Sequence, residues 1–103
     1  MDNQKNLQEM QFLEQNLQNI LYQKQAFQME LSETNSALKE IDNSGEEVFK
    51  IVGQLMLKTD KSKIKEELSN KKKMLDLKMQ TFEKQENSLT EQIDKLRGEI
   101  LKK

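Results

Sequence analysis

Apolar residues in the first part of the chain recur in alternating steps of three and four. The spacing is unbroken if Lys24 and Thr34 occupy two of the apolar places. A heptad seam sustained over more than four repeats predicts a long helix that packs along one side against another helix. Its residues are Met10, Leu13, Leu17, Ile20, Phe27, Leu31, Leu38 and Ile41. The helix is expected over residues 3–43, because Asp-Asn-Ser-Gly at 42–45 favours a turn and a left-handed C-cap.

A second seam with the same spacing runs through the C-terminal part and predicts a helix over residues 60–101. Thr59 and Asp60 are both good N-caps for its start. Polar residues interrupt this seam at Lys65, Lys72 and Glu86, and polar seam residues lower stability but fix register. The apolar seam residues are Leu68, Leu75, Met79, Phe82, Leu89, Ile93, Leu96 and Ile100.

Between the two helices, residues 47–59 are rich in β-branched and apolar side chains and predict a β-hairpin. Gly53-Gln54 fits a two-residue type II′ turn, which needs glycine first. The strands then pair Val52 with Leu55 and Ile51 with Met56. The alternative is a helix, since Phe49, Val52 and Met56 also fit a helical stripe, but β-branched residues and Gly53 disfavour it.

Both faces of this predicted hairpin are apolar, with Val48, Val52, Leu55 and Leu57 on one and Phe49, Ile51 and Met56 on the other. A lone two-stranded hairpin is marginal in water, and its two edges are unpaired. We therefore expect it to be an oligomerisation element whose copies share a barrel or sandwich. Its residues are Val48, Phe49, Ile51, Val52, Gly53, Leu55, Met56 and Leu57.

The charges favour folding the two helices back on each other. Residues 1–47 carry nine acidic and three basic side chains, a net of −6, and residues 48–103 carry nine acidic and fourteen basic, a net of +5. The fold class predicted is mainly α, a single domain over 1–103 built as an antiparallel two-helix coiled-coil hairpin with an apical β-hairpin. A long parallel dimer interrupted in its middle is the alternative.

The composition lacks the residue types that most catalytic and metal-binding sites need. Without His or Cys there is no imidazole base, thiol nucleophile or soft metal site, and three glycines form no phosphate-binding loop. We expect no enzyme, no metal and no cofactor. The lysines at 71–73 lack interleaved aromatic residues, which argues against nucleic acid binding. No signal peptide or membrane-spanning run is present, so a soluble cytoplasmic protein without membrane contact is expected.

At the free ends of the two helices, apolar residues exceed what one seam needs. Phe12 follows the seam residue Met10 by two places and is expected to point outward, and Leu7 and Leu101 are also off the seam. Single exposed apolar residues are common and need no function. Their position nevertheless suggests a contact surface, the tip patch, of Leu7, Met10, Phe12, Leu13, Leu96, Ile100 and Leu101.

Four segments carry a resemblance to a known family. They are QKQ-x-x-Q-x-EL-x-E from Gln23, AL-x-EI from Ala37, VFKIVGQLMLKT from Val48 and KEEL from Lys65. These segments resemble the β-type subunit of prefoldin, in its archaeal form, over about residues 7–96. The chain has room for one β-hairpin between its helices and not for two, and one hairpin is typical of the β type.

The resemblance implies a hexamer of two α-type and four β-type chains whose hairpins join in a double β-barrel. It implies an ATP-independent holdase that binds unfolded polypeptides at the tip patch and delivers them to a group II chaperonin. The alternative function, from another class, is a structural coiled-coil tether or assembly protein that binds no unfolded chains.

Overall fold

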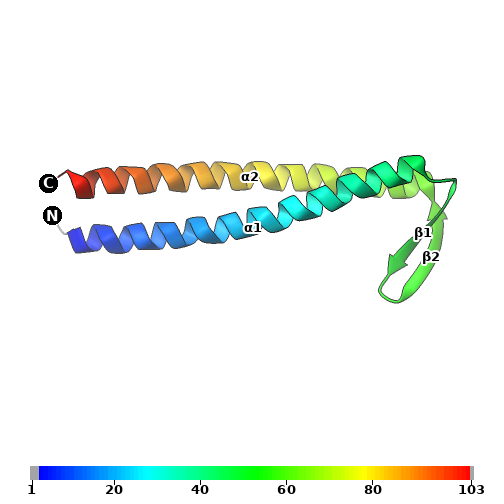
Figure 1. Ribbon diagram of the computed structural model, residues 1–103, viewed down its shortest axis with the longest axis horizontal. Helices are drawn as coiled ribbons and strands as arrows, with labels where there is room; N and C mark the ends of the chain where they lie inside the picture. Colours follow the sequence, from blue (N-terminus) through cyan, green and yellow to red (C-terminus); the bar gives the residue numbers. More distant parts are fainter. Residues whose placement is uncertain (1–2, 103) are drawn as a thin grey trace. The chain divides into compact units, whose positions relative to one another are not determined.

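The computed structural model describes residues 3–102, so Met1, Asp2 and Lys103, at the ends of the predicted domain, lie outside the described residues. Helix α1 spans Asn3–Asn43, strands β1 and β2 span Glu47–Val52 and Leu55–Asp60, and helix α2 spans Lys61–Leu101 (Figure 1). The predicted fold class is confirmed: two long helices are joined by a small antiparallel hairpin. The chain forms two compact units, a terminal unit of residues 3–27 and 78–102 and a hairpin unit of residues 28–77.

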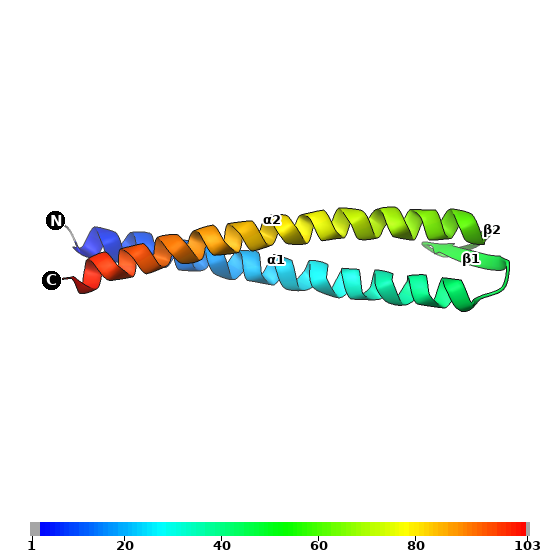
Figure 2. The same cartoon turned by 90° about the horizontal axis from the view of Figure 1, so that it is seen from above.

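In the terminal unit the start of α1 and the end of α2 lie side by side and run in opposite directions (Figures 1 and 2). Leu13, Ile93 and Leu96 are buried between them, and Met10, Leu17 and Leu89 pack against this core. Farther along α1, the ring of Phe27 lies 5.3 Å from that of Phe82, tilted by 48°. The Nζ atom of Lys78 lies 5.9 Å from the centre of the Phe27 ring, within cation–π range.

Apart from Lys65 and Lys72, the residues of both predicted seams are buried or half-buried, including the polar residues Lys24, Thr34 and Glu86. Lys24 and Glu86, which occupy apolar places on different helices, form an ion pair of 3.1 Å. Thr34, which fills the other gap in the first seam, is 3% exposed, and its hydroxyl donates to the carbonyl of Glu30 at 2.8 Å. The hydroxyl of this threonine is hydrogen-bonded within its own helix, so it needs no partner on α2.

The second seam needs a correction near the hairpin. Lys65 and Lys72 are exposed, and Ile64 is half-buried together with Leu68. The polar places assigned to the seam at Lys65 and Lys72 therefore belong to the surface. At the first of these places Ile64, one position before Lys65, takes the inward place, since a step of one residue turns a helical side chain by about 100°. At the second place the lysines at 71–73 are all exposed, so no neighbouring apolar residue replaces Lys72.

The β-hairpin has the predicted register: Val52 pairs with Leu55, Ile51 with Met56, and the ladder extends to Glu47 and Asp60. Gly53 has a φ of +61° and no other described residue has a positive φ. A glycine with positive φ followed by a residue with negative φ is the backbone of a type II′ turn, as predicted.

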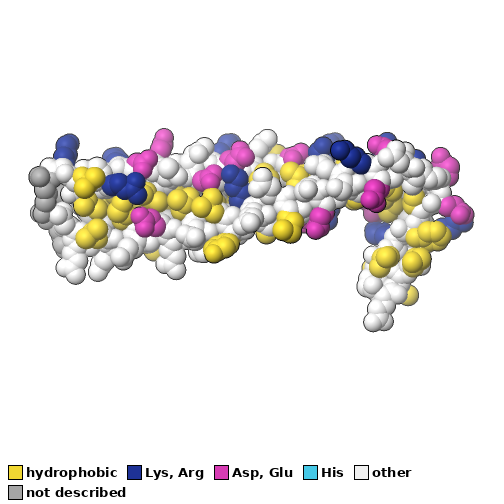
Figure 3. Space-filling view, viewed as in Figure 1, with side chains coloured by type: hydrophobic (Ala, Val, Ile, Leu, Met, Phe, Trp, Pro, Cys, Tyr) yellow, Lys and Arg dark blue, Asp and Glu magenta, His cyan; other side chains and the backbone are white. Residues whose placement is uncertain are grey.

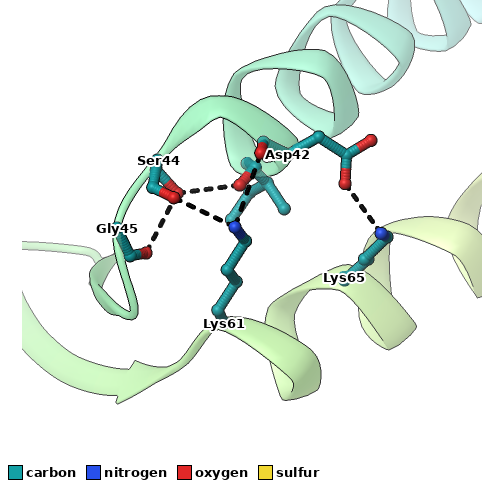
Figure 4. A network of polar contacts seen from close by, with 6 residues as sticks. Asp42, Ser44, Gly45, Lys61 and Lys65 are labelled. Carbon is teal, nitrogen blue, oxygen red and sulfur yellow. Dashed lines mark hydrogen bonds and ion pairs between the residues drawn. The ribbon is translucent and has the colours of Figure 1, made fainter.

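The end of α1 differs from the predicted left-handed C-cap, because neither Asn43 nor Gly45 has a positive φ. Instead the hydroxyl of Ser44 donates to the carbonyl of Ile41 at 2.8 Å, and the backbone N–H of Ser44 donates to the same oxygen. Lys61 donates to the carbonyls of Ser44 and Asp42 (Figure 4). An ammonium group here is favourable because the last carbonyls of a helix carry partial negative charge.

Candidate functional site: two exposed apolar surfaces

The β-hairpin presents a large apolar surface. Six of its apolar side chains are at least about half exposed, up to 70% for Ile51; they are Phe49, Ile51, Val52, Leu55, Met56 and Leu57. Val48 is half-buried. The observed pairing places these residues on the two faces expected from the sequence. Both faces thus expose side chains whose burial would be worth about 1.5–3 kcal/mol each.

The edges of the hairpin are open as well. Among the described residues the sheet contains two strands only, so each strand has one edge without a ladder partner. Lys50 in β1 pairs with Glu67 in α2 at 3.0 Å, which ties the hairpin to the start of that helix. Exposed faces and open edges together are the features by which strands add to other chains.

The second apolar surface lies at the end of the terminal unit, where the chain begins and ends (Figures 1 and 2). Leu7, Phe12 and Leu101 are 48%, 62% and 75% exposed. Phe12 points outward, as its place off the seam indicates. Yellow apolar groups gather over this end of the unit in Figure 3.

The other residues of the tip patch have a different environment. Leu13 and Leu96 are buried in the core of the terminal unit, and Met10 and Ile100 are half-buried. Leu13 and Leu96, with Met10 packed against them, lie between α1 and α2 in the terminal unit. The exposed apolar area of the patch comes mainly from Leu7, Phe12 and Leu101.

Charged groups offer little chemistry in the described part of the chain. No three Asp or Glu side chains among residues 3–102 are grouped so as to hold a metal ion. The Lys65 ammonium, which bonds to Asp42 at 2.7 Å, lowers the pKa of that carboxyl, with help from Lys61. Neither described helix has an apolar stretch long enough to cross a bilayer.

Sequence reasoning missed the role of Lys61. Its ammonium connects the start of α2 to the end of α1. The signal available in the sequence was a lysine directly after a strand, close to a helix end rich in orphan carbonyls. That signal is weak, because many lysines precede or follow strands without any such contact.

A coiled-coil hairpin whose connecting β-hairpin is exposed on both faces defines the class of prefoldin-type chaperone subunits. The prefoldin subunit family model matches residues 4–103. The prefoldin β subunit of Sulfurisphaera tokodaii is 37% identical over 99 residues, which cover 94% of this chain and 79% of that protein. The β subunit of Thermococcus onnurineus is 40% identical over 89 residues, 84% of this chain and 77% of the relative.

The crystal structure of the prefoldin β subunit from a Thermococcus strain superposes with a TM-score of 0.90 at 36% identity, covering 95% of this chain and 88% of that one. The chain belongs to the prefoldin subunit family, and these three relatives are β subunits. Members of this family are chaperone cofactors rather than enzymes, and they form hetero-oligomers with α subunits.

Proposed function

We propose that this chain is the β-type subunit of a holdase that binds unfolded polypeptides without nucleotide and delivers them to a group II chaperonin. The observation that carries the proposal is the exposure of Leu7, Phe12 and Leu101 at the end of the terminal unit. Contact between these exposed Phe and Leu side chains and apolar groups of a client is favourable, because it removes both apolar surfaces from water.

The proposed assembly is a hexamer of two α-type and four β-type chains. Its contacts are the exposed faces and open edges of the β-hairpin, which join with those of other subunits in a shared double β-barrel. Closing a barrel removes every unpaired edge and buries one apolar face of each hairpin. The hairpin residues from Val48 to Leu57 are the proposed oligomerisation element.

Holding a client in this way needs no deep pocket. Each tip offers a few apolar side chains and binds weakly, but several tips on one assembly contact the same unfolded chain. Linked weak contacts raise the overall affinity by about 10²- to 10⁴-fold when the linkage allows simultaneous binding. Because the tips bind the unfolded client and not its folded form, release follows when the client buries its own apolar groups.

Within the tip patch we assign two roles. Leu7, Phe12 and Leu101 contact the client directly. Leu13 and Leu96 hold the two helices in place beneath them, with Met10 and Ile100 at the border between core and surface.

The test replaces Phe12 and Leu101 by Ser in the assembled complex. We expect the aggregation of a chemically denatured client to be suppressed several-fold less well, because the largest exposed apolar groups of the end are gone. Light scattering during dilution of the client from denaturant measures the effect. Native mass spectrometry verifies that the variant assembles like the wild type.

The matched control replaces Met29 and Met74 by Ser, since these side chains are 63% and 62% exposed but belong to the hairpin unit. Full suppression is expected from the control. Equal suppression by the Phe12 and Leu101 variant, assembled as a hexamer, would remove the tip patch as the client site.

A further inference from the structure

The face of α1 opposite the helix–helix seam in the terminal unit has an unusual composition. It carries a stripe of exposed amide side chains interrupted by one tyrosine, which we call the amide stripe: Gln8, Gln11, Gln15, Gln18, Tyr22 and Gln25. The steps are three and four residues, as in the seam, but each stripe residue precedes a seam residue by two. At about 100° per residue, the stripe points away from α2.

This composition is specific to one helix and one unit. The corresponding places of α2 in the terminal unit include Lys84, Glu91 and Asp94, as expected of a solvated helix face. In Figure 3 the edge of α1 that points away from α2 in this unit is white with some yellow, and charged groups gather elsewhere on the unit. The absence of charge along six successive places of one face therefore distinguishes it from ordinary solvent-exposed helix surface.

Apolar contact groups adjoin the stripe. Leu7 lies four residues before Gln11, and Phe12 lies three residues before Gln15, so both are neighbours of stripe residues on the helix surface. Tyr22 is 66% exposed, and a shallow depression of about 160 Å³ is lined by Gln18, Leu21, Tyr22 and Gln25. The amide stripe is thus continuous with the exposed part of the tip patch.

From these features we infer that the amide stripe binds the main chain of an extended, unfolded polypeptide. This inference rests on the proposed holdase function and adds a second kind of contact to it. The tip patch holds apolar side chains of the client. The amide stripe binds the segment of the client that lies between those side chains.

The chemistry of the stripe fits a peptide backbone. Each glutamine amide offers two donors and an acceptor with two lone pairs, which match the C=O and N–H groups that every residue of an unfolded chain exposes. A stripe without charge neither selects nor repels clients by their charge. Adaptable amides beside a rigid tyrosine are also the composition of protein surfaces that bind varied partners.

The length of the stripe suits this occupant. From Gln8 to Gln25 the helix rises about 26 Å at 1.5 Å per residue. An extended chain covers that distance in about eight residues at 3.3 Å each. Individual amide contacts are weak in water, so the stripe contributes through several contacts made together with the apolar ones.

The test uses the complete assembled complex with Gln11, Gln15 and Gln18 replaced by Ala, which preserves the helix. The control replaces Gln80, Asn87 and Gln92 of α2 by Ala. The probe is a fluorescent peptide of about 20 Gly, Ser, Ala and Thr residues, which has a backbone but no large apolar or charged side chain. We expect the stripe variant to bind this peptide about tenfold more weakly than the wild type, as three lost hydrogen bonds predict, and the control to bind unchanged.

A second probe, an apolar denatured polypeptide, separates this inference from the proposed function. If the wild type holds the apolar probe but does not bind the polar peptide, or the stripe variant binds it as tightly as the wild type, the inference is overturned and the holdase function stands. If the wild type holds neither probe, the holdase function fails. A changed native mass of the stripe variant would assign the stripe to contacts between subunits and would also overturn the inference.

Discussion

Asp42, in the last turn of α1, is contacted by two lysine side chains of α2. Its carboxylate pairs with Lys65 at 2.7 Å, and Lys61 donates to its backbone carbonyl (Figure 4). Both ammonium groups contact the C-terminal end of α1. The bond to Lys65 is the main reason why the pKa of this carboxyl is lower than its ordinary value.

The pH dependence of stability follows from that shift. A carboxyl whose pKa is lower in the folded than in the unfolded chain stabilises the fold above about pH 4, and loses this contribution as the pH falls through the folded value. Replacing Asp42 by Asn should therefore lower the unfolding midpoint slightly at pH 7, and the difference from the wild type should shrink below about pH 4. Thermal unfolding of both proteins from pH 7 to pH 2 measures it. A difference that is constant over this range would contradict the assignment.

Lys24 and Glu86 show how two unfavourable seam residues compensate each other. Their side chains are 22% and 26% exposed, so the pair is partly shielded from water. Each would be costly alone among apolar neighbours, and a pair of opposite charges specifies one alignment of the helices against slipped ones.

A double-mutant cycle with Lys24→Met and Glu86→Gln tests this pairing. We expect a coupling of about 1 kcal/mol, near the top of the range for exposed pairs, because of the partial burial. Urea unfolding of the four proteins gives the value, and added salt should reduce it. A cycle on the exposed pair Lys71 and Glu30 serves as the control with a smaller coupling. A coupling near zero for Lys24 and Glu86 would mean that packing alone sets the register.

At the scale of elements, the β-hairpin depends on one backbone conformation. Gly53 has a φ of +61°, and Gly45, before β1, has no positive φ. A Cβ atom built on either glycine meets no other atom within 4 Å, so the two sites differ in backbone conformation and not in available space.

We therefore expect Gly53→Ala to destabilise the hairpin by about 1 kcal/mol or more, and Gly45→Ala to be nearly neutral. Since an isolated hairpin is marginal, the loss at Gly53 should appear as weaker assembly. Native mass spectrometry over a dilution series compares the two variants with the wild type. The same dissociation profile for both alanine variants would show that the turn conformation does not limit assembly.

The helices and the hairpin also show what local sequence reveals at this scale. The three-four spacing identified both helices, and the β-branched run with Gly53 identified the strands and their pairing, because periodicity and turn chemistry act within a few neighbouring residues. The end of α1 was predicted at the right place but with the wrong mechanism. Side-chain bonds from Ser44 and Lys61 replace the left-handed residue there.

At the scale of the whole molecule, the exposed apolar hairpin is the feature that favours contact with other chains. Ile51 and Leu55 lie on opposite faces, and both side chains are well exposed. Placing Asp at either site costs the isolated chain little. Because a barrel buries one face of each hairpin, Asp at one of these two sites would be a buried charge.

We expect at least one of the variants Ile51→Asp and Leu55→Asp, the one on the face that the barrel buries, to prevent the formation of a six-chain assembly with α-type partners, and both to leave the helical content unchanged. Native mass spectrometry and circular dichroism provide the two readouts. Met74→Asp, on the exposed surface of α2, is the matched control and should assemble normally. Normal assembly of both hairpin variants would exclude the barrel as the contact between subunits.

The candidate site was recognised from sequence in part. The outward position of Phe12 followed from its place two residues after Met10, a property of one helix. Leu13 and Leu96 are buried core residues, whereas Leu7 and Leu101 are exposed. This difference depends on how α1 and α2 meet in the terminal unit. Sequence periodicity gives the face of a helix, but the depth of burial at a helix end depends on the partner helix.

Features that arise within one short stretch, namely the two helices, the strands, their register and the turn at Gly53, could be derived from the order of residues, because spacing and backbone preference act locally. The pairing of Lys24 with Glu86, the contact of Lys61 with the end of α1 and the division of the tip patch into core and surface came from the tertiary structure. These features join residues from different elements. Their contacts depend on the alignment of α1 with α2, which the packing of both seams fixes and neither seam contains alone.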